Sequence, residues 1–171
     1  MINYTEMKHS DTGMPTWDAF LGPMLVTART EKEWTTQDLI NETIKAIKLP
    51  RDLAAMKYAK SKDLIAYNRA GWALSDLKIA GLLGNPTRGM YTVSDLGKKV
   101  LKDRELIEIT REYVHSFPKY REHAKQIQSK AKDDVEETID SSANLTVGNI
   151  AEWVEHYNDN IAEELLRRLM A

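Results

Sequence analysis

A helix that runs directly into a tight β-hairpin constrains the fold of this chain more than any other feature. Tyr67 to Ala80 has helical character, and Gly81 follows as a C-terminal stop. Two short runs with strand character come next, Leu82-Leu83 and Met90 to Val93, and the Gly- and Pro-containing segment between them predicts a turn. The chain is therefore expected to place a small hairpin immediately behind a helix.

Further helices are predicted on both sides of this unit. Apolar residues recur at spacings of three and four from Trp17 to Leu25, where Pro23 should kink the helix or lie near its start. Thr35 or Thr36 is the expected cap of a second helix, whose apolar stripe comprises Leu39, Ile40, Ile44 and Ile47. Ser94 is the expected cap of a short helix after the hairpin.

Three helices followed by a two-stranded hairpin is the order of elements in a winged helix-turn-helix domain. We therefore predict a mainly α fold, with a winged helix-turn-helix over residues 15–103 followed by additional C-terminal helices. The other segments are a disordered N-terminus (1–14), a helical extension (104–128), a polar linker (129–145) and an amphipathic connector or dimerisation helix (146–171). The last segment carries an apolar helical stripe that favours a homodimer: Val147, Ile150, Val154, Tyr157, Ile161, Leu165 and Leu169.

The composition of the chain argues against several classes of function. Its 171 residues contain no cysteine, which excludes disulfides and thiolate metal sites, and its 4 histidines are scattered. No apolar run approaches the length of a membrane span, and the N-terminus lacks the features of a signal peptide. We therefore expect a soluble, cytoplasmic protein with no metal, no cofactor and no membrane partner.

Charge is distributed unevenly along the chain. Lys and Arg outnumber Asp and Glu by 14 to 10 between Met14 and Asp103, whereas acidic residues outnumber basic ones by 14 to 9 beyond Asp103. A basic block followed by an acidic one suits a nucleic-acid-binding module joined to another element. Ordinary variation in charge is the alternative explanation.

The helix predicted from Tyr67 to Ala80 carries most of the candidate DNA-binding residues. On a helical wheel its small and aliphatic residues share one side, and Asn68, Ser75 and Lys78 lie on or beside the opposite side. Such a helix suits the major groove of DNA, where Asn pairs with adenine edges and Ser or Lys contacts bases or phosphates. The full set of candidates for binding double-stranded DNA is Lys60, Lys62, Tyr67, Asn68, Arg69, Trp72, Ser75, Lys78 and Arg88.

Each candidate also has an ordinary structural interpretation. A polar outward face is what any solvated helix shows, and Trp72 suits the core as well as a DNA contact. Arg88 reaches a phosphate or the minor groove if the hairpin acts as a wing, and is otherwise a solvated loop residue. Lys57, Lys60 and Lys62 either contact phosphates ahead of the helix or form a solvated cluster.

Several short motifs resemble, in sequence and spacing, the N-terminal winged-helix domain of Mrr-type restriction endonucleases. They are Tyr67-Asn68-Arg69-Ala70-Gly71-Trp72-Ala73, Leu77-Lys78, Ala80-Gly81-Leu82, Arg88-Gly89, Ser94 with Gly97, and Pro15-Thr16-Trp17-Asp18-Ala19-Phe20 with Pro23 and Leu25. The final helix, ending in Ala162 to Leu169, resembles the connector that precedes the nuclease domain in that family.

The resemblance implies a type IV, methylation-directed restriction system, in which a PD-(D/E)xK nuclease domain follows the connector. Asp76-Leu77-Lys78 has the D-x-K spacing, but it lies in the predicted helix with Leu77 in the core, and no strand carries an acidic partner for a metal. We therefore expect no catalytic site in this chain, and a parent protein that is a DNA endonuclease.

The resulting prediction is a DNA-binding targeting domain of an Mrr-like restriction endonuclease, recognising methylated duplex DNA, with the nuclease domain absent from this chain. Two alternatives remain. One is a stand-alone winged-helix transcriptional regulator that dimerises through its last helix. The other is a winged-helix module that binds other proteins, which a lack of positive charge around Lys62, Arg69 and Arg88 would favour.

Overall fold

The structure is a computed structural model that describes residues 2–134 of the 171. The helices are α1 (Leu21–Ala28), α2 (Thr36–Ala46), α3 (Arg51–Ala54), α4 (Ile65–Ile79), α5 (Asp95–Asp103), α6 (Arg111–His115) and α7 (Pro118–Asp134). Short 3-10 helices are η1 (Tyr4–Glu6), η2 (Trp17–Phe20) and η3 (Leu106–Glu108). The strands are β1 (Trp34–Thr35), β2 (Leu83–Gly84) and β3 (Met90–Val93).

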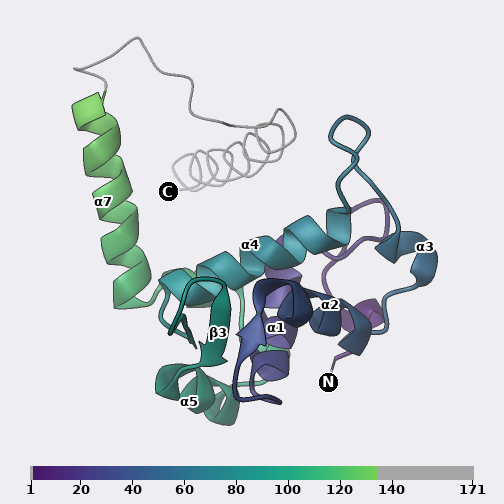
Figure 1. The fold of residues 1–171 in the computed structure, drawn as a ribbon, viewed down its shortest axis with the longest axis horizontal. Helices are drawn as coiled ribbons and strands as arrows, with labels where there is room; N and C mark the ends of the chain where they lie inside the picture. Colours follow the sequence, from purple (N-terminus) through teal and green to yellow (C-terminus); the bar gives the residue numbers. More distant parts are fainter. Residues whose placement is uncertain (1, 135–171) are drawn as a thin grey trace, which may run out of the picture.

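Helices α1, α2 and α4 pack against one another around a shared hydrophobic core, with the small sheet at its edge (Figure 1). The sheet is antiparallel with the strand order β1-β3-β2, and Leu83 pairs with Val93 across the hairpin. In Figure 1, α4 runs above α1 and α2 while α5 lies below them. This arrangement confirms the predicted fold class, a mainly helical winged helix-turn-helix followed by further helices.

No sequence signal predicts the first strand of the sheet, β1. Trp34 pairs with Tyr91, so β3 has a partner strand on each side. The Trp34 indole donates from Nε1 to the Ala28 carbonyl at 3.3 Å, and Thr35 also serves as the N-cap of α2, accepting from the Asp38 amide at 3.1 Å. A strand of two residues leaves no alternating pattern, which is why the sequence predicts only the two-stranded wing.

Small side chains let α4 pack closely against its neighbours. Its buried residues are Ala66, Ala70, Ala73, Leu74 and Leu77. The neighbouring elements supply larger side chains that are fully buried, among them Phe20, Leu21, Met24, Leu25 and Leu39. Because alanine occupies little space, the backbone of α4 approaches the core and its opposite face points to solvent.

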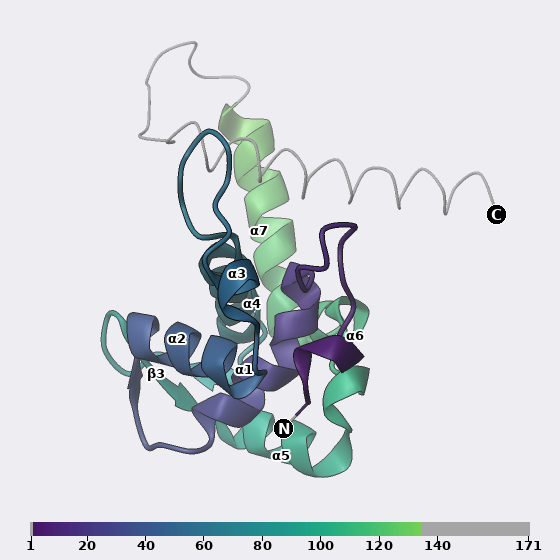
Figure 2. The ribbon, with the colours of Figure 1, turned by 90° about the vertical axis from the view of Figure 1, so that its right-hand side faces the viewer.

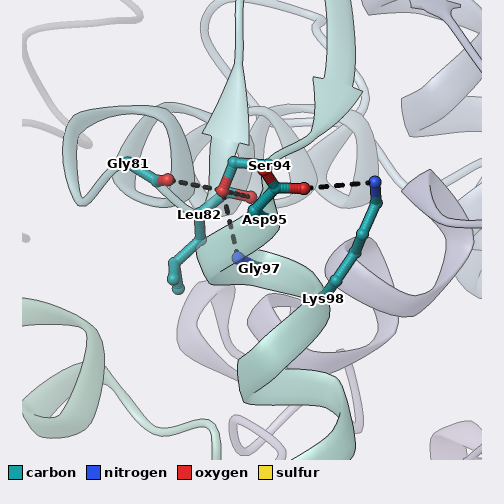
Figure 3. Close-up of polar contacts among 6 residues, drawn as sticks. All are labelled: Gly81, Leu82, Ser94, Asp95, Gly97 and Lys98. Atoms are coloured by element: carbon teal, nitrogen blue, oxygen red, sulfur yellow. Dashed lines mark hydrogen bonds and ion pairs between the residues drawn. The ribbon is translucent and has the colours of Figure 1, made fainter.

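A compact cap joins the wing to α5 (Figure 3). The Ser94 hydroxyl lies 2.7 Å from the carbonyl oxygen of Gly81 and 2.9 Å from that of Leu82, and it accepts a hydrogen bond from the Gly97 amide at 3.0 Å. A Cβ at Gly97 would lie 2.3 Å from the Leu82 carbonyl oxygen, so this close approach requires glycine. The predicted cap at Ser94 is confirmed, and it fixes α5 beneath the end of α4.

The N-terminus differs from the expectation of a disordered segment over residues 1–14. The structure describes residues 2–14 of this segment. Met7 and Met14 are buried there, and the Tyr4 amide donates to the Ile47 carbonyl at 2.9 Å. Two methionines in an otherwise polar segment provide enough apolar surface to pack it against the domain. The prediction was wrong because it weighed the average polarity of the segment and not these two side chains.

Helices α6 and α7 form the extension that follows the winged helix. Pro118 is the first residue of α7, a position where a missing backbone N–H is tolerated. The predicted linker over 129–145 begins inside α7, which runs to Asp134. Its remainder, and the predicted helix over 146–171, lie outside the described residues. No helix within residues 2–134 is long and apolar enough to cross a membrane.

Candidate nucleic-acid interface

The solvent side of α4 carries three of the predicted residues. Ser75 and Lys78 are exposed, and Asn68 is half-buried two turns before Ser75. The opposite side of the helix is buried, as the wheel predicts: Ala70, Ala73 and Leu77. With 15 residues, α4 is about 22 Å long, so this polar side extends over more than the width of a DNA major groove.

Two aromatic candidates flank the polar side of α4. Tyr67 is half-buried and packs against the core. Trp72 is also half-buried, and it interacts with other residues of the protein. The sequence leaves open whether Trp72 belongs to the core or contacts DNA. Its partial burial is compatible with both roles, because part of the residue is covered and part is accessible to a ligand.

Arg69 faces the N-terminal segment instead of solvent. Its Nη1 donates to the Pro15 carbonyl at 2.8 Å and lies 3.2 Å from Ser10 Oγ. On the helical wheel Arg69 stands more than a quarter-turn away from Asn68, on the flank that also carries Asp76. The guanidinium therefore fastens the N-terminal segment to α4, and Arg69 is left out of the interface proposed below.

The turn of the β2–β3 hairpin, residues 85–89, is held in shape from within. Asn85 donates from Nδ2 to two nearby carbonyl oxygens at 2.6 and 2.8 Å, and Gly89 has a φ of 80°. The Thr36 amide at the start of α2 donates to the Gly89 carbonyl at 3.1 Å. Arg88 is exposed on this braced tip and forms no ion pair with the residues that the structure describes.

Lys60 and Lys62 lie on a second hairpin that no pattern in the sequence predicts. Lys57 and Leu64 pair as an antiparallel bridge, and we call residues 57–64 the lysine hairpin. The segment projects beyond the N-terminal end of α4 (Figures 1 and 2). The lysine cluster is visible in the sequence, but the turn contains no glycine, proline or asparagine that would signal a hairpin.

Asp76, the carboxylate of the D-x-K spacing, binds the extension. Its Oδ2 lies 2.6 Å from Nε2 of His115, and the His115 ring stacks on Tyr120 with 3.9 Å between centroids. Burial raises the pKa of Tyr120 well above its usual range, and the nearby Asp76 carboxylate adds to this effect. In the part of the chain that the structure describes, no group of three or more His, Cys, Asp or Glu side chains is placed to hold a metal ion. Asp76 therefore acts as an anchor between α4 and the extension.

Comparisons with known proteins agree with the fold and identify the family to which the chain belongs. The model of the Mrr N-terminal domain matches residues 17–103. The chain is also similar to the type IV methyl-directed restriction enzyme EcoKMrr of Escherichia coli strain K12, with 27% identity over 92% of this chain and 53% of the relative. The chain thus spans about half the length of the curated relative it matches. No solved structure matches it. Because the family model covers half of the chain, from η2 to the end of α5, this protein belongs to the Mrr N-terminal domain family.

Proposed function

We propose that this chain is the DNA-targeting part of an Mrr-like restriction endonuclease and binds methylated duplex DNA. The observation that carries the proposal is the polar solvent side of α4 beside a braced wing with an exposed arginine at its tip. In winged helix-turn-helix proteins the corresponding helix enters the major groove. The related restriction enzyme is methyl-directed by its name, which supports methylated DNA as the ligand here.

In this proposal the residues of the interface divide into two roles. Asn68 and Ser75 face the edges of the bases, where an amide pairs best with adenine. Lys78, Arg88, Lys60 and Lys62 contact phosphates, which position the domain but carry no sequence information. The accessible parts of Tyr67 and Trp72 offer apolar surface to a thymine or methylcytosine methyl group.

Cleavage belongs, in the same proposal, to a nuclease domain and not to residues 2–134. Asp76, the carboxylate of the D-x-K spacing, lies in a helix and is bound to His115. We therefore assign this chain no catalytic role, and place its action in the cytoplasm, where bacterial DNA is found. Incubation of the purified chain with plasmid DNA and Mg²⁺ or Mn²⁺ should leave the DNA intact, and nicking that is lost in Asp76→Ala would contradict the assignment.

Fluorescence anisotropy on matched duplexes, with and without 5-methylcytosine or N6-methyladenine, tests DNA binding directly. Binding should weaken steeply with salt because lysine and arginine contacts release counterions. At least one methylated duplex should bind more tightly than its unmethylated match. An absence of binding at low salt would overturn the proposal and favour the alternative of a winged helix that binds proteins. Equal binding to every matched pair would remove methylation as the target.

A further inference from the structure

The connection between α2 and α4 is far more elaborate than its place in the fold requires. In a helix-turn-helix the two helices are joined by a turn of about 3–4 residues. Here the chain inserts α3 and then the lysine hairpin between the end of α2 at Ala46 and the start of α4 at Ile65. Ile47 is fully buried and Leu49 packs against the core, but neither α3 nor the lysine hairpin contains a buried residue. A role outside the core is therefore the better explanation for these two elements.

The lysine hairpin has its own backbone hydrogen bonds. The Tyr58 amide donates to the Asp63 carbonyl at 3.0 Å, and the Lys62 amide donates back to the Tyr58 carbonyl at 3.2 Å. At the base, the Ile65 amide donates to the Met56 carbonyl at 3.0 Å. Because Ile65 is the first residue of α4, this last bond ties the base of the hairpin to the start of α4.

The hairpin carries a net positive charge, because it contains three exposed lysines and one exposed aspartate, Asp63. Lys57, Lys60 and Lys62 are exposed, and none forms an ion pair with any residue that the structure describes. Lys62 has a φ of 64°, in the left-handed region that favours glycine or asparagine. A lysine in this conformation is strained, and strained residues are enriched at functional sites. Lys48, with a φ of 56° after α2, has the same conformation at the other end of this connection.

The position of the hairpin relative to α4 suits a DNA backbone. In Figure 2 the lysine hairpin projects above α4 and the wing turn projects to the left, both away from the N-terminal segment on the right. The N-terminal residues of a recognition helix approach the base edges most closely. The phosphates that border the groove therefore pass beside that end of α4, which is where the hairpin stands.

We propose that the lysine hairpin is a second wing, which contacts the phosphate backbone of duplex DNA at the N-terminal end of α4. The inference rests on the proposed function and deepens it, because it assigns the phosphate contacts of Lys60 and Lys62 to a hairpin that acts separately from α4. The hairpin increases affinity for any duplex, while α4 discriminates among sequences. Its removal should therefore weaken binding to all duplexes equally and leave the preference for methylated DNA unchanged.

Salt-dependent binding of the full chain tests this second wing. The double variant Lys60→Ala/Lys62→Ala should reduce the slope of log K against log salt by roughly 1.8, because each phosphate contact contributes about 0.9. The matched control is Lys99→Ala/Lys102→Ala, which removes the same charge from exposed positions on α5, on the opposite side of the molecule from the lysine hairpin. This control should retain a wild-type slope. Equal slopes for the two double variants would overturn the second wing, whereas a wild-type chain that fails to bind any duplex would overturn the proposed function itself.

A second variant separates the charge of the hairpin from its shape. Lys62→Gly removes the ammonium group and also relieves the left-handed backbone, so its melting temperature should equal or exceed that of the wild type. Its salt slope should nevertheless fall by about 0.9. Wild-type binding at every salt concentration by this well-folded variant would show that the hairpin does not contact DNA.

Discussion

At the scale of single residues, Asn68 and Arg88 are expected to contact different parts of the DNA, the bases and the phosphates respectively. Asn68 lies on the solvent side of α4, and Arg88 stands on the braced tip of the wing. Asn68→Ala should cost about 1–3 kcal/mol of binding free energy on the preferred sequence and little on random DNA, because it removes a base contact. Arg88→Ala should weaken binding to both and flatten the salt slope by about one phosphate contact. Anisotropy titrations on the two duplexes measure both effects, and unchanged affinity in both variants would show that this face does not read DNA.

Two glycines in helices predict opposite effects of the same substitution on stability. A Cβ at Gly97 would lie 2.3 Å from a backbone oxygen, whereas the nearest atom to a Cβ at Gly71 is Ile40 Cδ1 at 3.7 Å. Gly97→Ala should lower the free energy of unfolding by several kcal/mol, because the backbone at Leu82 has to move. Gly71→Ala should raise it by up to about 1 kcal/mol, because alanine favours the helix. Thermal and urea melts of the two variants should therefore shift in opposite directions, and a stable Gly97→Ala would show that α5 can move away from the wing.

At the scale of elements, the contact between Asp76 and His115 fixes the extension to α4. Both side chains are largely buried, with 13% and 23% of their surface exposed, and they join α4 to α6. His115→Ala should cost roughly 1.5–3 kcal/mol by removing a hydrogen bond to a carboxylate. Hydrogen–deuterium exchange should become faster in α6 and the start of α7 and stay unchanged in α2. Ser75→Ala, an exposed neighbour of Asp76, is the control, and slow exchange throughout α6 in His115→Ala would show that other contacts hold the extension.

The elements that the sequence predicts well are those with a repeating pattern or a strong local signal. The 3.6-residue periodicity locates α2 and α4, and Gly81, Ser94 and the turn residues locate the ends of the wing. What the sequence does not predict depends on contacts between distant residues. β1 forms because Trp34 pairs with Tyr91, which lies far away in the sequence. The lysine hairpin forms through backbone hydrogen bonds, and no residue type in it predicts a turn. The bonds of Arg69 with the N-terminal segment are not predicted for the same reason, since its partners at Ser10 and Pro15 lie far away in the chain.

At the scale of the whole molecule, the expected homodimer depends on the apolar stripe within 146–171, outside the described residues. Light scattering of the full chain at tens of micromolar should give the mass of a dimer. Ile161→Asp with Leu165→Asp should convert the dimer to a monomer, because it places charge in the centre of the stripe. A matched change outside the stripe, His156→Asp with Asn160→Asp, should leave the dimer intact. A wild-type monomer would contradict the prediction and point to packing of the stripe on the Leu106–Tyr120 segment.

The described N-terminal residues and the family match lead to a prediction about where the folded unit starts. The match begins at residue 17, but Met7 and Met14 are buried and Ser10 and Pro15 bind the Arg69 guanidinium. A protein that starts at Trp17 should unfold at a lower temperature than one that starts at Ile2, because the shorter protein loses the burial of both methionines. Calorimetry of the two proteins measures the difference, and equal melting temperatures would show that the segment is dispensable.

The bond between Arg69 and the N-terminal segment has a practical consequence for work with this protein. A recombinant fragment cut at the family boundary would leave a guanidinium without its partners on the helix that is proposed to enter DNA. In such a fragment the Arg69 guanidinium would be free to contact DNA, and the affinity of the fragment for any duplex would exceed that of the longer protein. Binding measured on minimal fragments of related proteins should therefore be compared with that of longer forms before it is attributed to the native surface.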